Sequence, residues 1–421
     1  MSTPSAPYPP SGGFMNAVRD SSRLLRQKSN IKIESDSIKR LLVSPAFTTS
    51  FKRVSGYHGL AFPLNFVNSL AELNFLSILS LLNFASGYRV PLHKQSGRGA
   101  WDSIRALLFS MFLGSSTGSG DFLSGEGMKA ITDQKVSELM GLSVHTEKPH
   151  ETIIGITVGE LGGPAYELVK LVTKTLNETG NVLVDGGYKD LGCFVLEALK
   201  EGEKVKIQKG TPDADVEVVL ERLVRAFPGF RDMGEVDGQP IYCFKKALFL
   251  ICGITVRFGS LSKSKSPTPP FPIPDITNIP ICADNVIPSL LIYLGVIDLS
   301  ESPESLSSLF PKSDLDSLLA VDPTSSAVEK KPPKEVPKEG PILTNDQAFI
   351  LRAAAIDTCE LIVEHARTIE VPPTQGEDGE SLEWIRKISL LEIDTWLWAV
   401  AKDRSDYRKL ERFVLRNTVF F

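Results

Sequence analysis

The helical spacing of apolar residues is the feature that most limits the folds open to this chain. Residues 70–84, "LAELNFLSILSLLNF", are apolar on nearly every side, which is typical of a helix buried in a core. Alternation with a period of two, which indicates strands, is scarce. The pattern predicts a mainly α fold with a few short strands, one pair turning at "VDGQPIY". The expected helices span residues 14–27, 70–84, 101–113, 161–176, 192–199, 216–227, 241–258, 286–294, 345–369 and 382–402.

The polar and proline-rich segments predict a single helical domain over residues 14–421. Residues 1–13 are polar and rich in Pro and Ser, so we expect them to be disordered. Residues 261–275 predict an extended Pro/Ser-rich loop. Residues 300–344, which include "VEKKPPKEVPKEG", have too few apolar residues to form a core and predict a disordered insert. The helices on either side of this insert should pack together, because neither half has a complete core.

Composition excludes several classes of protein. The net charge of −5 argues against binding to nucleic acid or to an anionic membrane over the whole surface. No apolar run is long enough to span a bilayer, and the N-terminus lacks a signal-peptide pattern. The five cysteines form no CxxC pair and the five histidines show no ligand spacing, so neither disulfides nor a metal site is expected.

Familiar nucleotide and nucleophile motifs do not fit their surroundings. "GSSTG", residues 114–118, follows an apolar helix, whereas a nucleophilic serine in this pattern needs a preceding strand. The glycine-rich segments "GITVGELGG" and "VDGGYKDLG" lack the Lys-Ser/Thr and the βαβ setting of phosphate or dinucleotide loops.

Acids beside aromatic or cationic residues are the remaining candidates for chemistry. Asp284 in "ICADNVIPSLLIYLG" begins a helix, so it is either a cap or the wall of a reaction pocket. Asp394 in "LLEIDTWLWAV" lies on an apolar helix, where it either pairs with a buried cation or binds a ligand. Trp398 shares the face of Asp394, and Trp396 should pack into the core behind it. Lys245 and Lys246 open an apolar helix, as a solvated face or as an anion site.

Seven segments in one order resemble the queuosine salvage proteins, which are queuosine 5'-phosphate N-glycosylase/hydrolases. They cover roughly residues 35–300 and 345–421, and the "NTVFF" ending is also similar. The segments are "PLNFVNSLAELNFLSILSLLNF", "RGAWDSIRALL", "TLNETGNVLVDGG", "AFPGFRDMGEVDGQPIYCFKKA", "ICADNVIPSLLIYLG", "TCELIVEHA" and "LLEIDTWLWAVAKDR".

The resemblance implies a helical fold like that of helical DNA glycosylases, and hydrolysis of queuosine 5'-monophosphate to queuine and ribose 5-phosphate. The matched acids Asp284 and Asp232 are expected to be catalytic. Residues expected to bind the substrate are Asn83, Phe84, Lys245, Lys246, Cys282, Asp394, Thr395 and Trp398. The chain departs from the family pattern where Cys282 replaces an aromatic residue, Asn285 and Val286 replace Tyr and Arg, Thr395 replaces Tyr, and Ala399 replaces an acid.

Such a substrate places strong demands on the site. Queuine is a 7-deazapurine, so the usual protonation of a purine at nitrogen 7 is impossible, and the barrier has to fall through stabilisation of the sugar cation. Its secondary ammonium favours acids, the 5'-phosphate favours the pair of lysines, and the base favours aromatic side chains.

Two other functions stay open at this point. One is a catalytically inactive protein that binds queuosine nucleotides, and the other is a nucleic-acid base glycosylase, which the net charge of −5 disfavours. No metal ion or organic cofactor is implied. We expect a monomer in the cytoplasm or nucleus whose ligands are queuosine 5'-monophosphate and queuine, without direct contact with nucleic acid or a membrane.

Overall fold

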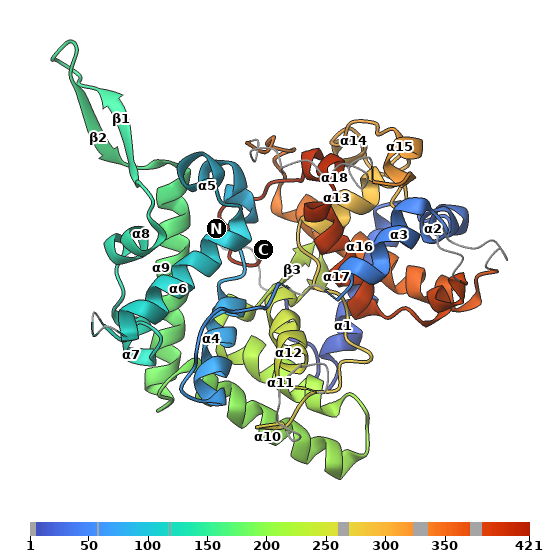
Figure 1. The fold of residues 1–421 in the computed structure, drawn as a ribbon, viewed down its shortest axis with the longest axis horizontal. Helices are drawn as coiled ribbons and strands as arrows, with labels where there is room; N and C mark the ends of the chain where they lie inside the picture. The colour runs from blue at the N-terminus through green and yellow to red at the C-terminus, as the bar shows by residue number, and fades with distance from the viewer. Residues whose placement is uncertain are drawn as a thin grey trace.

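The fold is taken from a computed structural model (Figure 1), which describes residues 6–56, 59–116, 118, 120–259, 269–322, 336–370 and 381–421. Helices dominate these residues, so the mainly α prediction is confirmed. The α-helices are α1 Phe14–Lys28, α2 Ser35–Leu42, α3 Pro45–Val54, α4 Ser69–Leu81, α5 Arg89–Ser96, α6 Ala100–Ser116, α7 Gly125–Ala130, α8 Asp133–Met140, α9 Gly163–Asp185, α10 Leu191–Lys209, α11 Ala214–Ala226, α12 Lys245–Phe258, α13 Val286–Tyr293, α14 Glu304–Ser307, α15 Leu315–Leu319, α16 Asn345–Thr368, α17 Leu390–Asp403 and α18 Ser405–Lys409. Short 3-10 helices are η1 Ser86–Tyr88, η2 Pro228–Phe230 and η3 Leu382–Lys387.

Two antiparallel pairs of strands accompany the helices in the described part of the chain. β3 Met233–Val236 and β4 Gln239–Tyr242 are joined by Asp237 and Gly238, which both have positive φ as a type I′ hairpin turn requires. The predicted strand turn is therefore confirmed. The second pair, β1 His145–Pro149 and β2 Thr157–Leu161, was not predicted and projects away from the helices near α8 and α9 (Figure 1).

The core forms around α4, whose residues from Leu73 to Leu81 are all buried. Because α4 is apolar on every side, it packs against α10, α12 and α6 at once. Helices from the two ends of the chain also meet: α1 packs along α16, and α3 packs against α17. Helices α16 and α17 also pack against α13, which begins just after Asp284.

Several predicted boundaries were wrong. The predicted helix over residues 241–258 begins only at Lys245, because β4 takes its first residues and Phe244 has a positive φ of 47°. The predicted helix over residues 382–402 is divided into η3 and α17, and the capping box of Ser389 and Glu392 starts the second part. Helices α9 and α10 continue about ten residues past their expected ends.

Parts of residues 1–13 and 300–344, for which the sequence predicts disorder, pack against the core in the segments that the structure describes. Ala6 is buried, and the hydroxyl of Tyr242 donates a hydrogen bond of 2.7 Å to the carbonyl of Pro7. In the insert, α14 and α15 bury Leu306, Leu318 and Leu319 against the core. Residues 1–5 and 323–335 lie outside the described residues.

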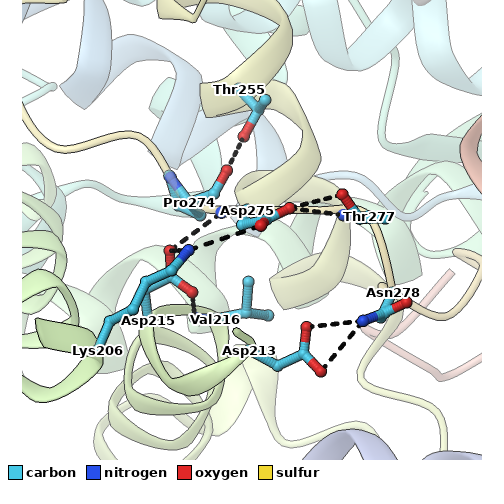
Figure 2. A network of polar contacts seen from close by, with 9 residues as sticks. All are labelled: Lys206, Asp213, Asp215, Val216, Thr255, Pro274, Asp275, Thr277 and Asn278. Carbon is cyan, nitrogen blue, oxygen red and sulfur yellow. Dashed lines mark hydrogen bonds and ion pairs between the residues drawn. The ribbon is translucent and has the colours of Figure 1, made fainter. Parts of the chain in front are cut away.

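The Pro/Ser-rich loop is described from residue 269 onward. Lys206 on α10 lies 3.1 Å from a carboxylate oxygen of Asp215 and 3.7 Å from one of Asp275, while the backbone N–H of Asp275 donates to Asp215 (Figure 2). These polar contacts fasten the end of the loop to α10 and α11. The preceding residues 260–268 lie outside the description.

None of the helices in the described segments could cross a membrane by itself. Helix α4 and the following residues 86–96 together have the length and composition for a span, but they meet at a bend of 64°. Since α4 lies in the core, burial inside the protein accounts for its apolar character.

Candidate active site

Asp232 organises the start of α12. Its backbone carbonyl accepts hydrogen bonds from the N–H groups of Cys243 and Phe244, at 3.0 and 3.1 Å. Its carboxylate accepts the N–H of Lys245, the first residue of α12, at 3.1 Å. These three bonds hold Phe244 in its left-handed conformation, which a bulky residue adopts only when its surroundings impose it.

Both carboxylate oxygens of Asp232 are occupied by Arg352. The two guanidinium nitrogens donate at 2.9 and 2.5 Å, and neither side chain is exposed by more than 1%. Arg352 also donates to the carbonyl of Ala283 at 2.9 Å and lies 4.6 Å from the ring centre of Phe421. Asp232, predicted to be catalytic, is thus the buried partner of a cation. Its arrangement fits the positioning of the segment around Asp284 better than contact with a substrate.

The two carboxylate oxygens of Asp284 have different surroundings, and only one of them caps α13. One oxygen accepts the N–H groups of Val286 and Ile287, at 2.7 and 3.4 Å. The other has no hydrogen-bond partner among the described residues. Asn285, which could have served as the cap, instead donates to the carbonyl of Phe413 at 2.8 Å. Capping therefore accounts for only one carboxylate oxygen of Asp284, and the second oxygen is available to contact a substrate.

Asp394 lies across from Asp284. It is partly buried on α17 and accepts a hydrogen bond of 2.7 Å from the backbone N–H of Cys282. Burial raises its pKa to about 6, the Cys282 N–H opposes the rise, and the negative charge of Asp284 adds to it. The two carboxylates therefore lie within electrostatic reach of each other.

Lys245 is the cation of this group. Its side chain is 4% exposed, and the ammonium donates to the carbonyl of Asn83 at 2.6 Å. Burial lowers the pKa of Lys245 to about 8, and the charge of Asp284 opposes that change. The bond to Asn83 uses one of the three N–H donors of the ammonium.

Lys246 lies in the core instead. It is fully buried, and its ammonium donates to the carbonyl of Leu81 at the end of α4, at 2.6 Å. The rings of Phe84 and Phe230 lie 4.9 and 5.9 Å away. The prediction that Lys246 contacts a phosphate does not fit this position. Phe84, expected to stack on a base, is only 3% exposed and packs against this lysine.

One face of α17 carries Asp394, Trp398 and Lys402, which are four residues apart in turn. The Lys402 ammonium lies over the ring of Trp398, whose edge meets Trp101 at 6.1 Å between ring centres. Trp396 points into the core and donates to Ser50 at 2.8 Å, so both tryptophans are placed as predicted. Thr395 is buried, and its hydroxyl donates to the carbonyl of Leu391 within the helix.

Of the predicted site residues, the structure brings six together in one region: Asn83 (through its carbonyl), Lys245, Cys282, Asp284, Asp394 and Trp398. The other four have structural contacts: Phe84, Asp232, Lys246 and Thr395. The structure also adds three cations that the sequence analysis missed: Arg89, Lys402 and Arg412. The helical spacing from Asp394 could have indicated Lys402. Nothing in the sequence pointed to the two arginines.

The larger of the two best-defined cavities is elsewhere. It has a volume of about 250 Å³ and lies between α10, α11 and residues 272–274, beside the polar contacts of Figure 2. None of the predicted site residues lines it. No group of three or more His, Cys, Asp or Glu side chains in the described residues is placed to hold a metal ion.

Comparison with known proteins identifies one segment of the chain. Residues 165–309 match the family model of the queuosine salvage protein. This segment is similar to the queuosine salvage proteins. It contains Lys245 and Asp284, whereas Asp394 and the C-terminal cations lie beyond it. A search of curated proteins found no match. The family match supports the resemblance found in the sequence and links the site to queuosine salvage.

Proposed function

We propose that this protein hydrolyses the N-glycosidic bond of queuosine 5'-monophosphate and releases queuine for salvage into tRNA. The observation that carries the proposal is that Asp284, Asp394 and Lys245 lie near the backbone of Cys282. Lys245, Cys282 and Asp284 belong to the segment that matches the family. Two carboxylates with different environments are what hydrolysis of a ribosyl bond requires.

In this proposal the two acids have different roles. Asp284 is fixed by the N-terminus of α13 and presents its unused oxygen to the sugar, where it stabilises the positive charge that develops as the C–N bond breaks. Asp394, with a pKa of about 6, is suited to take the proton from the attacking water near neutral pH. This role replaces the catalytic role predicted for Asp232, whose oxygens are occupied by Arg352.

Trp398 is the aromatic residue best placed for the base. It is partly exposed and lies on the same face of α17 as Asp394, whereas Phe84 is buried beneath Lys246. The ammonium of queuine would then approach the carboxylates from the side of α17.

A catalytically inactive protein that binds queuosine nucleotides is the second candidate. In its favour, Val286 and Ala399 are both buried and apolar, whereas the family pattern that the sequence resembles implies a charged residue at each position. Binding without turnover would support this alternative.

The deciding experiment incubates purified protein with queuosine 5'-monophosphate and measures free queuine by chromatography and mass spectrometry. We expect queuine to accumulate with the unmodified protein and not with Asp284→Asn. Bound nucleotide that stays intact would favour the inactive binding protein, and absence of both binding and release would reject both candidates.

A further inference from the structure

The hairpin of β1 and β2 leaves a group of apolar side chains in solvent. It projects from the helices beside α8 and α9 (Figure 1), and every residue from 151 to 161 is exposed. Eleven large apolar side chains are exposed among the described residues, and five of them lie between Ile153 and Leu161. The other six are at separate positions elsewhere in the fold. A projecting element that concentrates exposed apolar residues is a candidate interaction surface.

The hairpin has a defined shape although it has no third strand. At its tip, the N–H of His150 donates to the carbonyl of Ile156 at 2.8 Å. The ring of His150 accepts the N–H groups of Thr152 and Ile153, both at 3.2 Å. A two-stranded sheet alone is marginally stable in water, and further strands stabilise it. The hairpin would therefore gain from a partner that adds a strand.

The pairing of β1 with β2 determines which backbone groups are left free. Opposite residues of two antiparallel strands alternate between hydrogen-bonded and non-hydrogen-bonded pairs. Gly162 donates its N–H to the carbonyl of Val144 at 3.0 Å, and His150 bonds Ile156 in the same register. Even-numbered residues are thus the hydrogen-bonded ones, and odd-numbered residues of both strands direct their N–H and C=O groups outward.

The two outer edges of the hairpin differ in what they offer to another strand. The edge of β1 includes Pro149, which has no N–H to donate. The edge of β2 presents the N–H and C=O groups of Thr157, Gly159 and Leu161, none of which has a hydrogen-bond partner in the described part of the chain. This edge also has no lysine or proline of the kind that usually prevents strand addition. Strand addition is therefore expected at β2.

The sequence of β2 is complementary to a second copy of itself. Two antiparallel β2 strands with a two-fold axis at Gly159 place Thr157 opposite Leu161 of the second copy, and each such pair exchanges two hydrogen bonds. Val158 then lies opposite Glu160 of the second copy. No acid lies directly opposite another acid, and Glu160 already pairs with Lys148 in its own hairpin.

The same pairing covers exposed apolar side chains. Leu161 lies diagonally across from Gly159 of the second copy, which has no side chain, and the two Val158 side chains are diagonal neighbours on the opposite face. Beyond the strands, Ile156 comes next to residue 162 of the second copy. The apolar tip of each hairpin therefore lies along the base of the other, close to the start of α9.

The charge of the hairpin disfavours a membrane as the partner of this tip. Residues 145–161 contain three acids, Glu147, Glu151 and Glu160, and one lysine, Lys148. Segments that insert apolar residues into an anionic membrane surface have basic flanking residues instead.

We propose that two copies of this protein associate through β2 and form a four-stranded antiparallel sheet in the order β1–β2–β2–β1. The interface is independent of the proposed hydrolysis, because none of the candidate-site residues lies in the hairpin. A dimer replaces the monomer expected from the sequence. An interface of two strands and two tips is small, so the dimer should dissociate on dilution.

Sedimentation of the full chain over a wide range of concentrations tests this interface. Gly159 and Glu147 face each other in the hairpin, so Gly159→Pro and Glu147→Pro each remove one outward N–H at the same level, from opposite edges. We expect the unmodified protein and Glu147→Pro to form dimers and Gly159→Pro to remain monomeric. The melting temperature of the helical core should be the same in all three proteins, because the hairpin lies outside it.

Charge at Val158 gives a second test, with changes of opposite sign. Val158 faces Lys148 in its own hairpin and Glu160 of the second copy. Val158→Glu should keep the hairpin, through Lys148, and raise the dissociation constant of the dimer about 5- to 30-fold, because two pairs of like charges become opposed. Val158→Lys should lower the dissociation constant, although it places two lysines together within each hairpin.

Several outcomes would overturn the proposal. These are an unmodified protein that is monomeric at every concentration, a dimer that persists in Gly159→Pro, equal loss of the dimer in both proline variants, and equal effects of the two changes at Val158. A monomer that binds vesicles of anionic phospholipid through Ile154, shown by loss of binding in Ile154→Ser, would also overturn it.

Discussion

At the scale of single residues, the three acids found in the sequence differ in what their oxygens contact. Asp232 gives both oxygens to Arg352, Asp284 gives one to the start of α13, and Asp394 gives one to the N–H of Cys282. An acid that retains an uncommitted oxygen can act on a substrate, whereas one that neutralises a buried arginine holds the fold. The hydrogen bonds in the structure distinguish catalytic from structural acids more clearly than the residues adjacent to each acid in the sequence do.

Asp284→Asn should abolish queuine release and leave the fold intact. The amide oxygen of asparagine can still accept the N–H groups of Val286 and Ile287, so only the charge is lost. We expect the rate to fall by at least about 100-fold and the free energy of unfolding to change by less than about 1 kcal/mol. Urea unfolding measured beside the rate checks both, and a loss above about 2 kcal/mol would indicate that capping is the main role.

Asp232→Asn should instead destabilise the protein, because it leaves the guanidinium of Arg352 buried without its counter-ion. The expected loss in the free energy of unfolding is about 3–5 kcal/mol. Asp403→Asn is the matched control, since it removes an exposed partner of Arg53 and should cost less than about 1 kcal/mol. An Asp232→Asn protein of normal stability would contradict the structural role.

Because of Asp394, enzyme activity and folding stability should depend on pH in opposite directions. Its pKa is raised to about 6 in the folded protein, so the folded state binds this proton more tightly than the unfolded chain does. Its contribution to stability is then complete below the unfolded pKa near 4 and is lost as the pH rises through about 6. As a general base it should lose activity below about pH 6.

Asp394→Asn is the variant that separates these effects. It keeps an acceptor for the N–H of Cys282, so its stability at pH 7 should equal or exceed that of the unmodified protein while turnover falls. Thermal melting between pH 4 and 8 measures the first effect, and initial rates over the same range measure the second. Strong destabilisation at pH 7 would show that Asp394 has a structural partner.

At the scale of elements, the segment between α13 and α16 belongs to the folded core more than its composition indicates. Leu306, Leu318 and Leu319 are buried, and the hydroxyl of Tyr407 donates to the carbonyl of Leu318 at 2.7 Å. One buried leucine on α14 and two on α15 are enough to attach these short helices, and α15 packs against α3 and contacts α18 through Leu318. A count of apolar residues over 45 positions averages these anchors with the polar residues around them.

Leu306→Ala should therefore lower the free energy of unfolding by about 2–4 kcal/mol, because its side chain is 1% exposed. Val336→Ala, at a position that is 52% exposed, should change it by less than about 0.5 kcal/mol. Chemical denaturation of the two variants checks this. If both behaved like the unmodified protein, the original expectation of a disordered insert would be supported.

At the scale of the whole molecule, the proposed site exists because the C-terminal helices α16 and α17 pack against α13. The C-terminal Phe421 is 2% exposed and packs on Arg352 and on the ring of Phe413, which is 5.9 Å away. Gly87 allows the C-terminal segment to pass, since a Cβ atom there would lie 2.2 Å from the carbonyl of Leu415. The last residues thus cover the ion pair that supports the acids.

Phe421→Ala should consequently affect more than local packing. We expect a loss of about 3–5 kcal/mol in the free energy of unfolding, because the ring fills a buried site next to Arg352. Val419→Ala serves as the control and should cost less, because the side chain of Val419 is only partly buried. Equal small effects from both would show that the ion pair is stable without this cover.

The sequence by itself determined the helical class, most helix cores, the strand turn at residues 236–242 and the opposite directions of Trp396 and Trp398. These features depend on neighbours within a few residues, so their spacing along the chain is sufficient to predict them. It also carried the resemblance that the match over residues 165–309 supports.

Only the tertiary structure decided which acids are free. Asp232 and Arg352 are 120 residues apart in the chain, and Cys282 and Asp394 are 112 residues apart. The packing of distant helices determines which donor or acceptor lies next to a carboxylate or an ammonium. That neighbour decides whether the charged group makes a structural contact or stays available to a ligand. For the same reason Lys245 and Lys246, adjacent in sequence, have opposite surroundings: successive residues on a helix point about 100° apart, one toward the acids and one into the core.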